Sequence, residues 1–327
     1  MVSSRSAKLL VTGALAGLLL AGCADGPGQA GSAAIVNGKA ISLDSVQSQL
    51  NDFLSAPHSS SAQQQTTPAQ AARQIVGLDV LDQVIAGAGA KFHVSVPPSV
   101  LSAEFAQVGN LDQVAQNSGY SKAELQQLIT QYVFGVVYAT KYLPTLQIGY
   151  DRVLVPDQKT AASLAQKIAA DPADVRSIME SAAGGNAQAL SSATESGGQI
   201  LASDLQFQQD AQQGQSSPGD ERVLPLLSAK ANTVLAFQVD QGDWAVYYIH
   251  SVDNNGKADS QVQTLVGEAG VQEGGQAGLS MLSPYAQDLG IKISPRYGTW
   301  DPVDMAVVDP TGTPTYAYAP VRSQPSS

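Results

Sequence analysis

The chain has very little cysteine, histidine and positive charge. Its 327 residues include one cysteine and three histidines, and 17 Lys+Arg stand against 28 Asp+Glu, which gives a formal net charge of −11. One cysteine cannot form a disulfide within the chain, so stability rests on burial and hydrogen bonding. The absence of a Lys/Arg-rich block argues against a nucleic-acid partner, and the sequence has no phosphate loop for a nucleotide. No cysteine cluster, His-x-x-x-His pair or acidic calcium loop indicates a metal, and no cofactor is expected.

Long apolar runs are equally scarce, and the one present lies at the N-terminus. Residues 9–20 are apolar, follow a positively charged start and end in the tetrapeptide Leu20-Ala21-Gly22-Cys23. The run is short for a membrane span and typical of a secretory signal segment. Its end resembles the lipobox of bacterial lipoproteins, which implies cleavage after residue 22 and lipid attachment to Cys23 at the extracytoplasmic face of the cell membrane. The alternative is an ordinary signal peptide with an incidental cysteine.

The first half of the mature chain has helical patterns. Residues 23–33 are small and flexible and predict a tether. Asn37-Gly38 between apolar residues predicts a hairpin, because both turn positions need a positive φ. Thr67 with Gln70, and Ser121 with Glu124, have the spacing of capping boxes, and apolar residues repeat at helical spacing after each pair.

The pattern changes at about residue 149. Residues 151–155 predict a strand, 159–170 and 174–181 predict helices, and 234–239 with 244–252 predict an antiparallel pair, so that this region forms a small β-α-β-β unit. Residues 183–220 are rich in Gly, Gln, Ser and Ala and give no clear element, and 223–229 suggest a short helix. Residues 259–289 return to a glycine-interrupted helix, and 291–295 predict a short strand. The tail over 301–327 is expected to be disordered.

This order of features resembles the SurA/PrsA type of parvulin-like foldase, especially its lipoprotein relatives in actinobacteria. The strongest motifs are "VNGKAIS" after the tether and "IKISPRYGTWDP" near the end of the chain. The resemblance implies an α+β fold. A helical chaperone body would combine residues 34–148 with 258–300, and a parvulin-like β-α-β-β domain over 149–257 would be inserted between them. It also implies that the first and last strands pair and that the returning helix packs into the N-terminal helices.

The parvulin-like unit lacks the residues that active members of the family use. Those members place two histidines across the site, whereas this chain has Arg152 (or Asp151) and Tyr247 at the matching positions. Of the histidines, only His250 lies in the unit, since His58 and His93 precede it. Arg152 and Tyr247 therefore mark a candidate degenerate site, and no catalytic residue is assigned. An aromatic cluster at Trp244, Tyr247 and Tyr248 is expected to serve sheet packing.

The sequence leaves open three functions. The first is a lipid-anchored extracytoplasmic chaperone that binds unfolded or newly exported polypeptides without prolyl isomerase catalysis. The second is an active parvulin-type peptidyl-prolyl isomerase with altered site residues. The third is a solute-binding lipoprotein, although that class usually has two lobes of repeated strand-helix units, and only one such unit is evident here.

Overall fold

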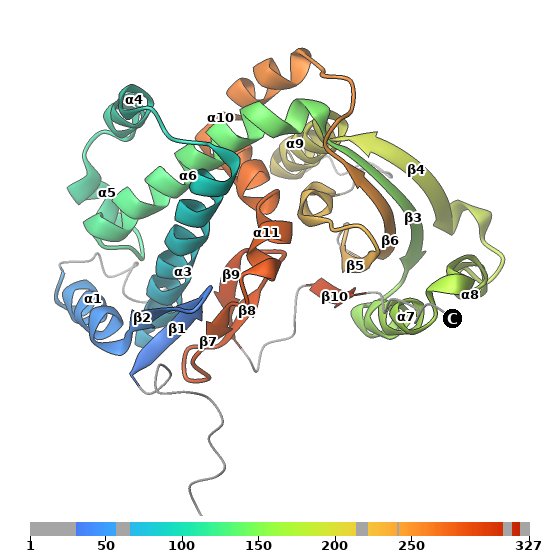
Figure 1. The fold of residues 1–327 in the computed structure, drawn as a ribbon, viewed down its shortest axis with the longest axis horizontal. Coiled ribbons are helices and arrows are strands. Elements are labelled where there is room, and N and C mark those ends of the chain that lie inside the picture. The colour runs from blue at the N-terminus through green and yellow to red at the C-terminus, as the bar shows by residue number, and fades with distance from the viewer. Residues whose placement is uncertain (1–30, 57–65, 214–221, 241, 310–315, 321–327) are drawn as a thin grey trace, which may run out of the picture.

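The fold is mixed α+β, as expected, with helices gathered on one side and a curved sheet on the other (Figure 1). The computed structural model describes residues 31–56, 66–213, 222–240, 242–309 and 316–320. The predicted signal segment, Cys23 and most of the predicted tether lie outside these residues. Within the described part of the chain, no helix is long and apolar enough to cross a membrane.

The helices occupy three stretches of the chain, which are the N-terminal half, the middle and the returning segment. Their bounds are α1 (Leu43–Ser55), α3 (Pro68–Phe92), α4 (Pro98–Val108), α5 (Leu111–Asn117), α6 (Lys122–Tyr142), α7 (Gln158–Ala170), α8 (Val175–Ala182), α9 (Gly197–Gln213), α10 (Gln261–Ser280) and α11 (Ser283–Asp288). Short 3₁₀ helices are η1 (Leu143–Thr145), η2 (Pro172–Asp174), η3 (Ala187–Ala189) and η4 (Leu224–Ser228).

The strands form a three-stranded, a five-stranded and a two-stranded sheet within the described residues, in the orders β2-β1-β7, β10-β5-β6-β3-β4 and β8-β9. Their bounds are β1 (Ser32–Val36), β2 (Lys39–Ser42), β3 (Gln147–Val155), β4 (Leu190–Ser196), β5 (Thr233–Gln238), β6 (Trp244–Asp253), β7 (Lys292–Ile293), β8 (Thr299–Asp301), β9 (Ala306–Val308) and β10 (Tyr316–Pro320).

Local sequence signals explain how the N-terminal elements begin. Asn37 and Gly38 have φ of 49° and 76° in the turn between β1 and β2, which confirms the predicted hairpin. The Thr67 hydroxyl accepts from the Gln70 amide at the start of α3, and the Gln70 side chain bonds back to the Thr67 N–H. The capping box predicted at the start of α6 is likewise present.

The helical body, here residues 32–146 with 261–308, is built from both ends of the chain. Strand β7 pairs with β1, with Ala34 opposite Ile293, so segments about 260 residues apart form one sheet. Its core contains Val46 from α1, Ile75 and Val84 from α3, and Leu282 ahead of α11, all with no solvent exposure. The returning segment is not one continuous helix, because Gly270 adopts a non-helical φ of 72° within α10.

Helix α10 crosses α6 in backbone contact. A Cβ built on Gly135 of α6 would lie 2.2 Å from the carbonyl oxygen of Gly275, and a Cβ on Gly278 would lie 1.8 Å from the carbonyl oxygen of Gly135. Only glycine fits at such an approach. Gly275 and Gly278, two of the glycines that interrupt the helical pattern of residues 259–289, therefore allow α10 to pack closely against α6.

The five-stranded sheet is antiparallel throughout and separates two clusters of apolar side chains. One face packs on α7 and α8 through residues such as Val153 and Val246. The other face packs on α9 and η4, and its cluster continues into the helical body through Leu143 and Val262. The sheet domain, here residues 147–253 with β10, is thus fixed to the helical body through a shared core.

Two sequence predictions are corrected in this region. Residues 183–220 gave no clear element, yet the described part of that stretch holds β4 and α9. The tail predicted to be disordered over 301–327 forms structure wherever it is described, since β9 pairs with β8 and β10 adds to the sheet beside β5. Strand β9 is short and β10 is an edge strand, so neither has the long alternating pattern that sequence rules detect.

Candidate functional site

The two residues of the candidate degenerate site lie directly opposite each other. Arg152 on β3 and Tyr247 on β6 are paired in the antiparallel ladder. Opposed residues in such a pair project from the same face of the sheet. This is the face that α9 and η4 cover, so the structure places Arg152 and Tyr247 together on it.

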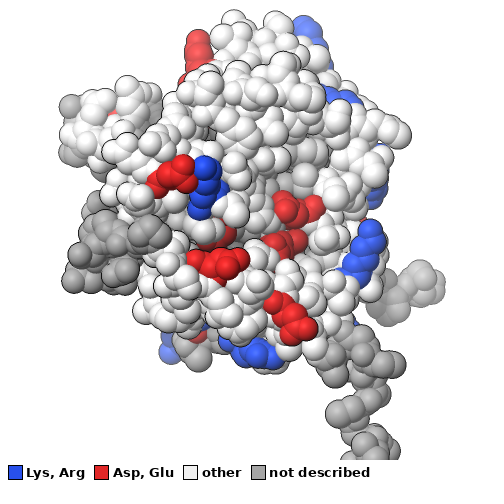
Figure 2. Space-filling model, turned by 90° about the vertical axis from the view of Figure 1, so that its left-hand side faces the viewer, with Lys and Arg blue, Asp and Glu red and all other residues white. Residues whose placement is uncertain are grey.

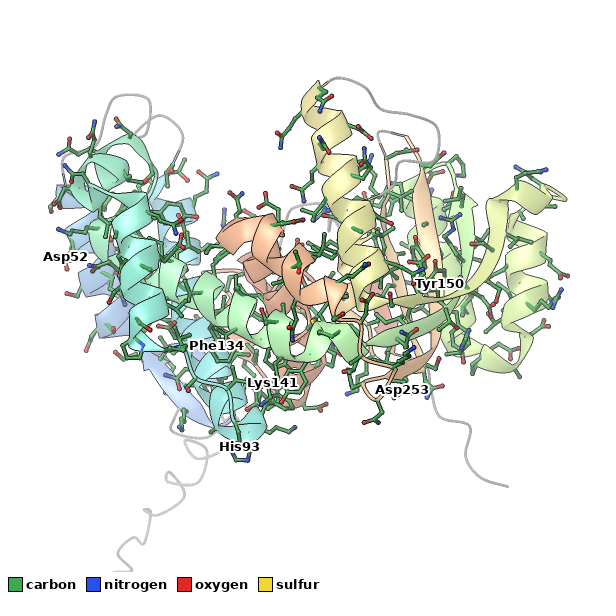
Figure 3. The ribbon with its side chains drawn as sticks, turned by 90° about the horizontal axis from the view of Figure 1, so that it is seen from above. Asp52, His93, Phe134, Lys141, Tyr150 and Asp253 are labelled. Carbon is green, nitrogen blue, oxygen red and sulfur yellow. The ribbon has the colours of Figure 1, made fainter. Side chains whose placement is uncertain are left out.

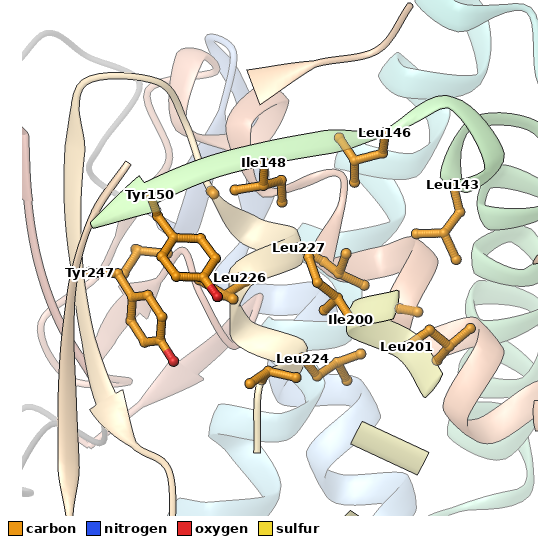
Figure 4. Close-up of a cluster of buried hydrophobic side chains, with 14 of the residues drawn as sticks. Leu143, Leu146, Ile148, Tyr150, Ile200, Leu201, Leu224, Leu226, Leu227 and Tyr247 are labelled. Atoms are coloured by element: carbon orange, nitrogen blue, oxygen red, sulfur yellow. The ribbon is translucent and has the colours of Figure 1, made fainter. Parts of the chain in front are cut away.

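The Tyr247 ring is part of a packed core. Its side chain has no solvent exposure, and its ring stacks on Phe237 with centroids 5.0 Å apart and meets Tyr150 edge-to-face at 5.1 Å. Figure 4 shows the Tyr150 and Tyr247 rings side by side, with leucines of η4 beside them. Such offset and edge-to-face pairs are favourable ring geometries. The ring is therefore enclosed by neighbouring side chains and is not accessible to solvent.

A tyrosine-carboxylate pair borders this core. The Tyr150 hydroxyl donates to Glu195 Oε1 of β4 at 2.5 Å, and Tyr150 is 5 % exposed. Burial, together with the hydrogen bond and charge of Glu195, raises the pKa of Tyr150, although the positive charge of Arg152 acts in the opposite direction. The phenol therefore stays protonated at physiological pH and acts as the hydrogen-bond donor of the pair. Sequence reasoning missed this pair because it missed β4.

A buried carboxylate holds the cover of this face in place. Asp204 of α9 is 2 % exposed, and its Oδ1 accepts from the backbone N–H groups of Val223 and Leu224 at 3.3 and 3.1 Å. Its Oδ2 accepts from Gln208 at 2.8 Å. Asp204 thereby caps the entry to η4 and joins α9 to the segment that carries Leu224. No sequence pattern indicated this role, because Asp204 lies in a polar, glutamine-rich stretch.

The described histidines take no part in this arrangement. His93 is exposed and adopts a left-handed φ of 52° at the end of α3. His250 is exposed on β6, with its Nδ1 3.5 Å from the Ser251 hydroxyl. His58 lies outside the described residues. Among all residues that the structure describes, no group of three or more His, Cys, Asp or Glu side chains could hold a metal ion.

An acid-amide network joins α1, α3 and α6 in the helical body. Asp79 accepts from Gln49 at 3.0 Å and from Gln127 at 3.4 Å, and Asp82 accepts from Gln127 at 2.7 Å. Burial raises the pKa of Asp79, and the negative charge of Asp82 adds to this rise, although the amide hydrogen bonds oppose it. Figure 2 views this side of the molecule and shows acidic side chains gathered around a hollow.

Two of the grooves in the described structure lie beside α6. The first, the body groove, has a volume of about 390 Å³ and runs between α3, α6, α10 and the β8–β9 hairpin. The second, the junction groove, has a volume of about 430 Å³ and lies where the helical body meets the sheet domain. Both fall in the size range of ligand sites in proteins.

Comparison with known proteins adds no relative to this picture. No protein-family model, curated protein or solved structure matches the chain. The candidate site is therefore defined by its own geometry, which is a filled sheet face around Tyr247 and open grooves on either side of α6.

Proposed function

We propose that the protein is an extracytoplasmic chaperone, tethered to the membrane through lipid on Cys23, which binds unfolded or newly exported polypeptides without catalysing prolyl isomerisation. The resemblance to SurA/PrsA-type foldases suggests the class. The helical body made from both ends of the chain, with a sheet domain inserted between them, is the arrangement that this class would require.

The body groove is the observation that carries the proposal. Its walls combine aliphatic side chains with amides, and they include Leu78, Leu81, Leu128, Leu279 and Val307 together with Gln70, Gln74, Gln131 and Gln276. Such walls accept apolar side chains and also offer hydrogen bonds to a peptide backbone. Arg73 and Asp304 also line the groove, so it offers charged groups as well.

Gln131 gives the groove an unused acceptor. Its side chain is 1 % exposed, and its Nε2 donates to the Leu78 carbonyl at 2.9 Å and to Asp82 at 2.6 Å. Its Oε1 has no hydrogen-bond partner in the described part of the chain. An unpaired buried acceptor costs about 1–3 kcal/mol, so a backbone N–H that reached it from a bound peptide would recover that energy.

The absence of catalysis is proposed from the sheet face. Prolyl isomerisation needs a slot for the proline ring, and Tyr247 with Phe237 and Tyr150 fills the corresponding space. The second candidate, an isomerase with altered residues, keeps one supporting observation, which is the opposed placement of Arg152 and Tyr247. A protease-coupled assay on Xaa-Pro peptides separates the two, because activity that disappears in an Arg152→Ala variant would establish the isomerase.

The chaperone proposal is tested by aggregation of unfolded clients in the presence of residues 24–327. We expect the wild-type protein to suppress aggregation, and Leu128→Asp, which places a charge in the body groove, to weaken this effect. Leu54→Asp is the matched control, since Leu54 lies on α1 and is already 52 % exposed. A wild-type protein that protects none of several unrelated clients would overturn the proposal.

A further inference from the structure

The junction groove has walls from both parts of the molecule. Phe92 ends α3, Tyr138 and Tyr142 belong to the last turns of α6, and Tyr285 belongs to α11. The opposite wall and floor come from the sheet domain and the segment ahead of α11, and they include Leu146, Ile148, Leu227, Ala229, Val252, Met281 and Pro284. The groove is therefore mainly apolar, with Lys230 and Asn254 as polar residues in its lining.

Four aromatic rings form a connected array along one wall. The Phe92 ring meets Tyr138, Tyr142 and Tyr285 edge-to-face at centroid distances of 5.7, 6.1 and 5.6 Å. Tyr138 and Tyr142 also lie 4.7 Å apart. Aromatic residues make up only 6 % of the chain, so this gathering is unusual for it. Rigid rings supply large contact area at low cost in side-chain entropy.

The Tyr138 hydroxyl is available to a ligand of the groove. Tyr142 donates to the Phe92 carbonyl at 3.0 Å, whereas the Tyr138 hydroxyl makes no hydrogen bond with the described residues. Tyr138 is 7 % exposed and lines the groove. Burial raises the pKa of Tyr138, and the neighbouring Tyr142 adds to this rise, so the hydroxyl remains a donor at physiological pH.

Three lysines lie in or beside the groove in a chain that is negative overall. Lys91 lies 4.8 Å from the Tyr285 ring centroid, Lys141 lies 5.1 Å from that of Tyr142, and Lys230 lines the groove itself. Lys141 also donates to the carbonyls that end α3, at Phe92 and His93, and Figure 3 shows Lys141 and His93 on one side of the molecule. Among these lysines Lys230 pairs with a carboxylate, Asp288, at 2.7 Å.

We propose that the junction groove binds an extended peptide segment whose apolar core is flanked by acidic residues. Apolar side chains would insert between the rings, the Tyr138 hydroxyl would donate to a backbone carbonyl, and Lys91 and Lys141 would pair with the flanking carboxylates. Aromatic-lined grooves with hydroxyl donors are an established way for proteins to bind extended, solvated backbone. The inference rests on the proposed chaperone function and names the chemistry of the client segment.

The test uses three fluorescein-labelled peptides that share one apolar core and carry Asp, Asn or Lys flanks. Their binding to residues 24–327 is followed by fluorescence anisotropy at low salt and again at high salt. A double variant, Lys91→Glu with Lys141→Glu, reverses the rim charge. Its matched control reverses two exposed lysines of α7, Lys159 and Lys167, which lie away from the junction groove.

We expect the Asp-flanked peptide to bind tightest and to lose roughly tenfold in affinity in the rim variant, because two ion pairs near the surface are each replaced by repulsion. The α7 control should leave the affinity unchanged, and high salt should reduce the preference for Asp flanks. Tyr138→Phe, which keeps the ring, should weaken all three peptides by about threefold. Equal affinity for the three peptides, or an unchanged affinity in the rim variant, would overturn the inference.

The same proteins separate this inference from the proposed function. Suppression of client aggregation without binding of any of the three peptides would refute the junction groove and leave the chaperone function standing. Charge-dependent peptide binding without suppression of aggregation would refute the chaperone function and support the groove as a peptide site. Thermal unfolding of each variant, compared with the wild type, shows that lost binding does not come from lost folding.

Discussion

The crossing of α6 and α10 gives the sharpest test of the architecture. In Gly278→Ala the new Cβ would lie 1.8 Å from the Gly135 carbonyl oxygen, whereas ordinary contact begins at 3.4 Å. The two helices must therefore separate by about 1.6 Å, the difference of these distances, because backbone atoms on the other side cannot rotate away. Overpacking of this kind costs typically 1–3 kcal/mol, and we expect about 3 kcal/mol since both partners are helix backbone.

Gly267→Ala is the matched control within the same helix. A Cβ at Gly267 meets nothing within 4 Å, and the residue is exposed. Replacing an exposed helical glycine by alanine stabilises by about 0.5–1 kcal/mol. Thermal unfolding followed by far-UV circular dichroism should lower the melting temperature by about 6 °C or more for Gly278→Ala and raise it slightly for Gly267→Ala. Equal shifts in the two variants would refute the close crossing.

Three further outcomes follow from single side chains. Asp204→Ala should lower the free energy of unfolding by about 2–3 kcal/mol, because two buried backbone N–H groups lose their acceptor. Guanidinium titrations measure this change, and an unchanged midpoint would contradict the capping role of Asp204. Burial raises the pKa of the Asp79 carboxyl above its ordinary value of 3.8, so the folded state binds the carboxyl proton more tightly than the unfolded state does. The contribution of Asp79 to stability therefore falls as the pH rises above 3.8. Asp79→Asn should remove this fall, and urea titrations at a series of pH values measure it. Cys23→Ala should abolish incorporation of a labelled fatty acid, and retained label would contradict lipidation at this residue.

Elements with strong local signals could be predicted from the sequence. The Asn37-Gly38 turn, the capping boxes at Thr67 and Ser121, and the β3, β5 and β6 strands were all expected and are present. Each rests on a few neighbouring residues whose chemistry permits few alternatives. The pairing of β1 with β7 was expected from the resemblance alone, since nothing local in either strand identifies its partner.

The elements that sequence reasoning missed depend on the rest of the fold. Strand β4 is polar and half-exposed at the sheet edge, and α9 is rich in glutamine, so neither has a strong apolar period. The tail strand β10 is stabilised by β5, which is distant in sequence. At the candidate site the resemblance alone singled out Arg152 (or Asp151) and Tyr247, and Arg152 lies opposite Tyr247 in the ladder. A packing role for Tyr247 was expected, but not the rings that enclose it, because Phe237 and Tyr150 reach it only across the assembled sheet.

The pairing of β1 with β7 has a consequence for the order in which the molecule acquires structure. The strands β3 to β6 lie within 107 consecutive residues, 147–253, and most of their sheet can assemble as soon as that stretch is free. The helical body cannot, because β1 must wait for a partner that follows it by more than 250 residues. Contacts of such long sequence separation form late, since the intervening chain must first be ordered. Until α10 is in place, the face of α6 that α10 covers in the folded protein remains exposed.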